Sequence, residues 1–188
     1  EDILNSAGSE GTPFMNKNFS TLYFTRCPNH KKRESGCQIM KASRTGSAFS
    51  DPIAVEIKTI DSLDVVGHPT LSSDELTLIF ASERRNGIGG KDLWISERES
   101  TSEEFGRPRN LSAIINTEGD ELYPFMRNDS TLYFASDGHG GMGGLDIFVT
   151  TLDSLGEWTT PVNLKSPINS IGNDYAITFH PTEERGFF

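Results

Sequence analysis

The stretch Tyr123–Phe148, YPFMRNDSTLYFASDGHGGMGGLDIF, places a glycine-dense turn between two apolar segments. Similar stretches begin at His68 (HPTLSSDELTLIFASERRNGIGGKDLW) and at Thr12 (TPFMNKNFSTLYFTRCPNHKKRESGCQIM), and a shorter one begins at Ala176 (AITFHPTEERGFF). The chain is therefore built from copies of one unit. Self-similarity of this kind is typical of repeat architectures.

The spacing of the copies is nearly constant. One place in the unit is held by a phenylalanine at offsets of 56, 54 and 54 residues: Phe24, Phe80, Phe134 and Phe188. A polar residue follows at offsets of 54 and 54: Gln38, Asp92 and Asp146. This spacing divides the chain into the end of a preceding unit (1–11), three full units (12–66, 67–121 and 122–175) and the start of a further one (176–188).

Each unit is expected to hold four short strands and no helix, because no segment has a helical period. In the third unit these strands are 123–126, 131–136, 146–151 and 161–164. The second strand is apolar on consecutive residues (Leu132-Tyr-Phe134), whereas a strand with one wet face would alternate. Such a strand is buried on both faces, as in a blade of a β-propeller.

We therefore predict an all-β fold, a β-propeller of four-stranded antiparallel blades that is incomplete in this chain. Residues 1–188 form a single propeller fragment in this interpretation, because propellers typically have four to eight blades. The remaining blades would lie in residues absent from this chain or in another chain. An isolated chain of these residues is expected to be insoluble, aggregated or partly unfolded.

The composition argues against two classes of partner. With 17 basic and 27 acidic residues the formal net charge is −10, which opposes binding to nucleic acid. The short basic cluster His30–Arg33 is expected in a solvated loop. No run of 18 or more apolar residues is present, so direct membrane insertion is not expected.

The glycine-rich turns are interpreted as structural. Their expected structural residues are Gly87, Gly89, Gly90 and Asp92 in the second unit, and Gly140, Gly141, Gly143, Gly144 and Asp146 in the third. The glycines would supply positive φ, and each aspartate would accept hydrogen bonds from loop N–H groups. Calcium binding by Asp146, with Asp137 and loop carbonyls, is the alternative. Gly138, Gly140 and Gly143 match G-x-G-x-x-G, but a strand follows where a nucleotide site needs a helix.

No catalytic motif is present, neither G-x-S-x-G nor H-E-x-x-H. The four histidines do not recur in register, so no repeated histidine site is expected: His30, His68, His139 and His180. We expect a non-enzymatic protein that holds neither a cofactor nor a metal.

The two cysteines flank one turn. In register with the second unit, Cys27 matches Glu83 and Cys37 matches Lys91, at the end of one strand and just before the next. A disulfide would staple the one turn that lacks the glycine-rich sequence, stabilising the fold by roughly 2.5–3 kcal/mol. It would also indicate an oxidising compartment. Two reduced thiols in a flexible turn are the alternative.

The pattern P-x-[FL]-x-x-[DN]-x-x-x-L-x-F-[AT]-S-[DE], a glycine turn and then D-[IL]-[FW], resembles the WD40-like PD40 propeller repeat of TolB-type periplasmic proteins. Its longer form is similar to repeats of OmpA-family envelope proteins. The cysteine copy (Tyr23–Cys27, then Gly36–Ile39) further resembles the PorE-type propeller of type IX secretion. Copy one departs from the pattern, because it lacks the glycine turn and has Gln38 in place of aspartate.

This resemblance implies a periplasmic, outer-membrane-associated scaffold that contacts other envelope or secretion-system proteins. Peptidoglycan would be bound only through a domain absent from this chain. Two alternatives remain open at this stage. One is a propeller accessory to a hydrolase of the prolyl-oligopeptidase type, and the other is a carbohydrate-binding or lyase propeller. A fold hosts many activities, so neither is decided by the repeat alone.

Overall fold

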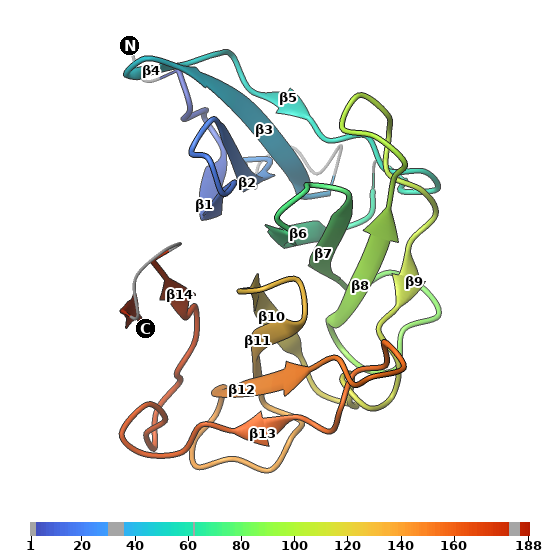
Figure 1. The fold of residues 1–188 in the computed structure, drawn as a ribbon, viewed down its shortest axis with the longest axis vertical. Helices are drawn as coiled ribbons and strands as arrows, with labels where there is room; N and C mark the ends of the chain where they lie inside the picture. The colour runs from blue at the N-terminus through green and yellow to red at the C-terminus, as the bar shows by residue number, and fades with distance from the viewer. Residues whose placement is uncertain (1–2, 30–35, 62, 181–184) are drawn as a thin grey trace.

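The structure is a computed structural model that describes residues 3–29, 36–61, 63–180 and 185–188. Three antiparallel sheets and a hairpin curl around a common axis into an open arc (Figure 1). Among the described residues there is no helix, and hence none long and apolar enough to cross a bilayer. The chain therefore has the expected all-β fold, an incomplete β-propeller in which each sheet is one blade. The basic cluster His30–Arg33 lies outside the described residues.

Each full blade is formed from strands that are consecutive in the chain. The first blade contains β1 (Ser9–Met15), β2 (Thr21–Cys27), β3 (Gln38–Thr45) and β5 (Ile53–Ala54), and β4 (Ala48–Phe49) pairs antiparallel with the end of β3. The second contains β6 (Val66–Leu71), β7 (Thr77–Ser82), β8 (Asp92–Glu97) and β9 (Arg109–Asn110). The third contains β10 (Glu121–Met126), β11 (Thr131–Ser136), β12 (Asp146–Thr151) and β13 (Val162–Asn163). The hairpin consists of β14 (Thr178–Phe179) and β15 (Gly186–Phe187).

The outermost strands are shorter than expected. We predicted 53–57, 109–111 and 161–164, but each pairs over only two residues. In the first blade the reason is that the chain leaves its own sheet for the next one. Ile57 forms a parallel bridge with Phe105 of the second blade, and Lys58 N donates to Phe105 O at 2.9 Å.

The second strand of the second blade is buried on both faces, as its apolar sequence predicts, whereas Leu22 of β2 and Tyr133 of β11 are only half-buried. Leu78, Ile79 and Phe80 are each fully buried. Ile79 belongs to the core between the second and third blades, whereas Leu78 and Phe80 belong to the core between the first and second. Two successive interfaces therefore share one strand, which is why its side chains do not alternate between apolar and polar.

The innermost strand of each blade carries a bulge at the same place. The register with the second strand shifts after Gly11, Gly67 and Leu122. The next residue is in the left-handed region and precedes a proline in all three blades: Thr12 (φ 50°), His68 (φ 53°) and Tyr123 (φ 51°). Ala176 (φ 62°) continues the series before the hairpin. A bulge re-aims the side chains that follow it, and these side chains form the site described next.

Candidate interaction site

Three phenylalanines meet where the innermost strands converge. The ring centroids of Phe14 (β1) and Phe125 (β10) are 6.4 Å apart, and those of Phe125 and Phe179 (β14) are 6.0 Å apart. Thr70 holds the equivalent place in β6 and is fully buried. The Thr70 hydroxyl accepts a hydrogen bond from Met126 N at 2.9 Å. Phe14 and Phe125 hold equivalent places in their strands, and Phe179, one residue beyond that place in β14, extends the aromatic cluster.

A groove of about 680 Å³ lies beside this cluster. It lies at the end of the axis that carries the turns β1–β2, β6–β7 and β10–β11, and we call it the axial groove. Its volume lies within the roughly 300–1,000 Å³ of sites that enclose a small ligand. The lining residues come from all four units: Pro13, Phe14, Met15, Lys17, Phe19, Leu71, Ser72, Ser73, Phe125, Met126, Arg127, Asn128, Asp129, Thr178, Phe179 and His180.

Carboxylates at the turn tips tie neighbouring blades together beside the groove. Glu75 of the second blade accepts hydrogen bonds from Tyr23 Oη and Asn16 Nδ2 of the first, both at 2.7 Å. Asp129 of the third blade accepts from Ser73 N at 2.7 Å and from Ser73 Oγ at 2.5 Å. Burial, and then the hydrogen bond to Glu75, raise the pKa of Tyr23 far above its ordinary value. The walls of the groove are therefore held by bonds that cross between blades.

Phe19 occupies the same left-handed turn position as these two carboxylates, with φ 58° against 61° for Glu75 and 49° for Asp129. Its ring lines the groove and is 45% exposed. Two cations also line the groove. Lys17 is exposed, and the Arg127 guanidinium lies 4.3 Å from the Phe179 ring centroid. The groove thus combines aromatic surface with positive charge.

His68 makes structural contacts between the second and third blades. Among the described residues no three His, Cys, Asp or Glu side chains lie close enough together to hold a metal ion. The His68 ring stacks on Tyr123, with 4.2 Å between centroids, and its Nδ1 accepts a hydrogen bond from Tyr123 N at 3.1 Å. Burial, with a smaller contribution from Lys91, lowers the pKa of His68 to about 4. A neutral His68 therefore joins the second blade to the third.

Asp92 closes its glycine-rich turn at the opposite end of the axis from the groove. It is fully buried and accepts hydrogen bonds from the N–H groups of Ile88 and Gly89. Asn110 Nδ2 donates a third hydrogen bond to it at 2.7 Å. The carboxylate therefore gathers loop donors that would otherwise be unpaired, which is the geometry of a turn cap.

Asp146 closes the next turn with fewer partners. One oxygen, Oδ2, accepts from Met142 N at 2.8 Å and from Gly143 N at 3.0 Å. The other, Oδ1, is buried and has no hydrogen-bond partner in the structure. The Asp137 carboxylate, which the calcium alternative requires, instead accepts from Asp120 N at 2.7 Å. It therefore faces the linker before β10.

The loop glycines have a different physical role from the one expected. The left-handed region contains none of these seven: Gly87, Gly89, Gly90, Gly140, Gly141, Gly143 and Gly144. A Cβ on Gly89 would lie 2.2 Å from Thr117 O, and one on Gly143 would lie 2.1 Å from Gly172 O. These loops pack directly on the backbone of the next inter-blade linker, and a side chain would separate them. Gly140 has open space at this position.

A linker motif, N-[ST]-x-G-x-[DE], recurs at residues 5–10, 116–121 and 169–174. Its role follows from the structure and not from the sequence. The buried Asn116 side chain accepts from Leu93 N at 2.8 Å and donates to Leu93 O at 3.0 Å. Asn169 makes the same two bonds to Ile147, at 2.8 and 2.9 Å. The asparagine thus acts as an extra strand residue that ties each linker to the preceding blade.

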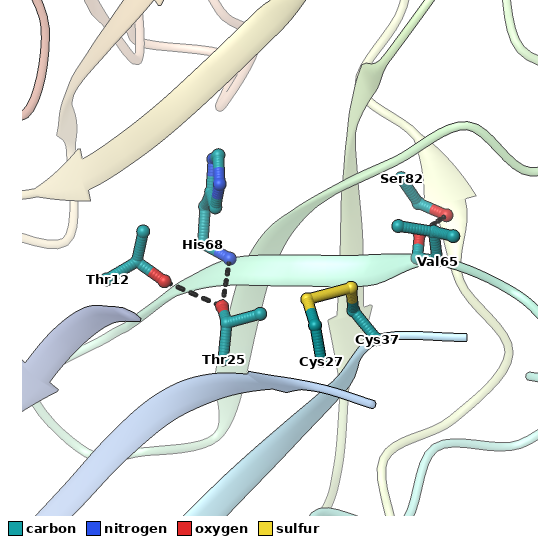
Figure 2. The surroundings of a disulfide bond; sticks show 7 residues. All are labelled: Thr12, Thr25, Cys27, Cys37, Val65, His68 and Ser82. Atoms are coloured by element: carbon teal, nitrogen blue, oxygen red, sulfur yellow. Dashed lines mark hydrogen bonds between the residues drawn. A yellow bond between two sulfur atoms is a disulfide. The ribbon is translucent and has the colours of Figure 1, made fainter. Parts of the chain in front are cut away.

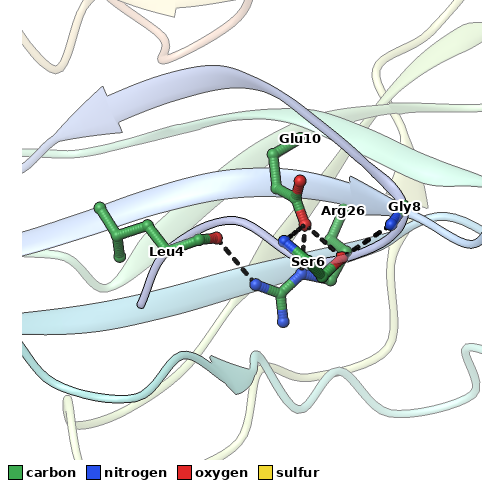
Figure 3. A network of polar contacts seen from close by, with 5 residues as sticks. All are labelled: Leu4, Ser6, Gly8, Glu10 and Arg26. Atoms are coloured by element: carbon green, nitrogen blue, oxygen red, sulfur yellow. Dashed lines mark hydrogen bonds and ion pairs between the residues drawn. The ribbon is translucent and has the colours of Figure 1, made fainter. Parts of the chain in front are cut away.

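The acidic residue at the end of the motif closes the linker on itself. Glu121 is fully buried and accepts from both N and Oγ1 of Thr117, at 2.8 and 2.6 Å. In the first copy Glu10 accepts from N and Oγ of Ser6 and pairs with Arg26 Nε at 2.8 Å (Figure 3). The motif therefore stabilises the blade junctions and places the glycine loops.

The disulfide expected between Cys27 and Cys37 is present, with an S–S distance of 2.02 Å. It lies at the ends of β2 and β3, close to Thr25, whose Oγ1 accepts a hydrogen bond from His68 N at 2.8 Å (Figure 2). Gln38, at the place of the capping aspartate, is exposed. The disulfide therefore lies next to the position that a buried aspartate holds in the second and third blades.

The comparisons with known proteins support the fold. No protein-family model and no curated protein sequence matches the chain. A puromycin-hydrolysing peptidase of Mycobacterium tuberculosis is similar in structure, with a TM-score of 0.56 and 16% identity over 94% of this chain and 24% of that one. TolB from Acinetobacter baumannii has a TM-score of 0.54 and 11% identity over 84% of this chain and 33% of its own. The chain thus spans a quarter to a third of these proteins and shares with them the β-propeller fold.

Proposed function

We propose that this chain is a non-catalytic scaffold domain whose axial groove binds a segment of another protein in the bacterial envelope. The observation that carries the proposal is the aromatic surface of the groove. Phe19 is 45% exposed at a turn tip where the next two blades have carboxylates that bind the preceding blade. A large apolar ring that is exposed to solvent within a groove is typical of a binding surface.

The disulfide supports an extracytoplasmic location. Structural disulfides persist in oxidising compartments, and the periplasm is one of these. Together with the repeat pattern, this favours an OmpA-family envelope protein that links a secretion machine of the type IX kind to peptidoglycan. In that arrangement the propeller provides the protein contacts, and peptidoglycan is bound by a domain outside this chain.

Site-specific photo-cross-linking in cells tests the contact. A benzoylphenylalanine at position 19 should cross-link to a discrete envelope protein. The same group at Leu155, which is 84% exposed and does not line the groove, should not. Equal products from both positions, or none from position 19, would show that the groove is not a docking site.

Trapping thiols during cell lysis tests the compartment separately. We expect Cys27 and Cys37 to be fully oxidised in growing cells, because the bond is present in the folded chain. A predominantly reduced pool would place the protein in a reducing compartment and would refute the envelope assignment. It would leave the groove itself as a binding site.

A further inference from the structure

We propose that Asn86 is a site of spontaneous covalent modification, at which its side chain closes onto the Gly87 backbone nitrogen and is deamidated to aspartate and isoaspartate. Three observations carry the inference: the sequence at this position, the exposure of both residues, and the lack of hydrogen bonds that would hold the reacting groups. The inference is independent of the proposed function.

The reaction needs only water besides the two residues. The Gly87 nitrogen attacks Cγ of Asn86, its proton passes through solvent to the departing amide, and ammonia leaves. Water then opens the resulting five-membered succinimide at one of its two carbonyl carbons. Opening at Cγ breaks the new bond and gives aspartate. Opening at the backbone carbonyl carbon breaks the original peptide bond and gives isoaspartate, in which the main chain runs through the former side chain.

The sequence favours this reaction at one position. Asn86 is the only asparagine of the chain that is followed by glycine. A Cβ on the following residue crowds the nitrogen that must attack, whereas glycine leaves it open. Asparagine is accordingly one of the thermolabile residues of proteins. The equivalent position in the third blade, 54 residues further on, is Gly140, which has no amide to lose.

The structure leaves both reacting groups accessible. Asn86 and Gly87 are exposed in the turn between β7 and β8, and Asn86 is in the left-handed region with φ 71°. Within the described part of the chain, neither the Asn86 side chain nor the Gly87 N–H forms a hydrogen bond. By contrast, the buried side chains of Asn116 and Asn169 are each bound to a strand. The fold therefore does not restrain Asn86 as it restrains these asparagines.

The isoaspartyl product acts on the cap formed by Asp92. Gly87 packs so closely on this carboxylate that a Cβ would lie 2.6 Å from Oδ2. The next two N–H groups, those of Ile88 and Gly89, are donors to the same carboxylate. Isoaspartate inserts one more carbon atom into the main chain before Gly87 and displaces these donors, whereas aspartate leaves the main chain unchanged. The isoaspartyl form should therefore be the less stable of the two.

The experiment follows the full-length, folded protein during incubation in mildly alkaline buffer, which favours loss of the N–H proton. Mass spectrometry of peptides prepared at mildly acidic pH should show replacement of the amide by a carboxyl group at residue 86 and at no other asparagine of this chain. The rate should match that of a synthetic peptide covering residues 83–90. An isoaspartyl methyltransferase should label the aged protein. Asn86→Gly, which copies the third blade and tolerates a positive φ, should abolish this labelling.

Other outcomes overturn the inference. A rate at least about 10-fold below that of the peptide, equivalent to a barrier raised by about 1.4 kcal/mol, would show that the fold protects Asn86. Deamidation without isoaspartate would indicate direct hydrolysis and would refute the succinimide route. In urea denaturation the isoaspartyl form should unfold at a lower midpoint than Asn86→Asp, and equal midpoints would refute the effect on the Asp92 cap. None of these results involves the axial groove, so the proposed function fails or stands separately.

Discussion

Asp92 and Asp146 are equivalent residues with different hydrogen bonding, so replacing each by asparagine is a controlled experiment within one chain. Both are fully buried. At Asp92 both carboxylate oxygens accept, and Oδ2 accepts from Ile88 N and Asn110 Nδ2. At Asp146 one oxygen accepts both hydrogen bonds and the other has none. An amide can therefore replace the carboxylate of Asp146 without losing a hydrogen bond, but it cannot replace that of Asp92 without such a loss.

The expected magnitudes follow from this difference. In Asp92→Asn the amide NH₂ must face the N–H of Gly89 or the donors to Oδ2, leaving at least one buried donor unpaired at a cost of about 1–3 kcal/mol. In Asp146→Asn both bonds remain, and the loss of charge assistance is offset by relief of a buried charge. We expect that change to stay within about 1 kcal/mol. For a chain of this size 1 kcal/mol corresponds to about 2–4 °C in Tm.

The assay is urea denaturation of the full-length protein, because the isolated chain is expected to aggregate. Both variants and the wild type are followed by tryptophan fluorescence, with equal m-values as the condition for comparison. We expect Asp92→Asn to lower the free energy of unfolding clearly more than Asp146→Asn. If the order is reversed, the turn-cap interpretation is wrong. A chelator should leave the wild-type Tm unchanged. A fall in Tm that Asp146→Asn abolishes would instead support the calcium alternative at Oδ1.

Three further predictions concern other parts of the chain. Thiol labelling of the unfolded, unreduced protein should find no free cysteine, and two labelled thiols would disprove the Cys27–Cys37 bond. Burial lowers the pKa of His68 to about 4 in the folded state, below its ordinary value of 6.5. The contribution of the neutral ring to the free energy of unfolding is therefore fully present above pH 6.5 and is lost as the pH falls through about 4. Denaturation at several pH values should show this loss and should show less of it for His68→Asn; equal pH profiles would contradict the assignment. Gly89→Ala should destabilise by at least about 3 kcal/mol, because its Cβ meets linker backbone, whereas Gly140→Ala should cost less than about 1 kcal/mol. Similar losses of unfolding free energy in the two variants would refute the close-packing role.

The repeat in the sequence is sufficient to predict the propeller architecture. Leu78, Ile79 and Phe80 are apolar on consecutive residues, and a strand can bury all of them only between two neighbouring sheets. The disulfide also followed from register, because Cys27 and Cys37 flank a hairpin turn whose ends are necessarily close. These conclusions depend on period and local spacing, which are properties of the sequence itself.

The role of the loop glycines could not be read in the same way. Glycine permits both positive φ and close packing, and composition does not distinguish them. The structure assigns the second role at Gly89 and Gly143, because each loop lies against the linker of the following blade. That contact joins residues nearly 30 apart in the chain, such as Gly89 and Thr117.

The axial groove could not be predicted from the sequence and follows only from the tertiary structure. Phe14 and Phe125 belong to different copies of the repeat, and their rings approach each other although a third copy lies between them in the chain. Glu75 and Asp129 likewise bind partners in the preceding blade. A period shows that positions are equivalent, but it does not say how equivalent positions approach one another. That approach is set by the curvature of the blades around the axis and by the size of each side chain there.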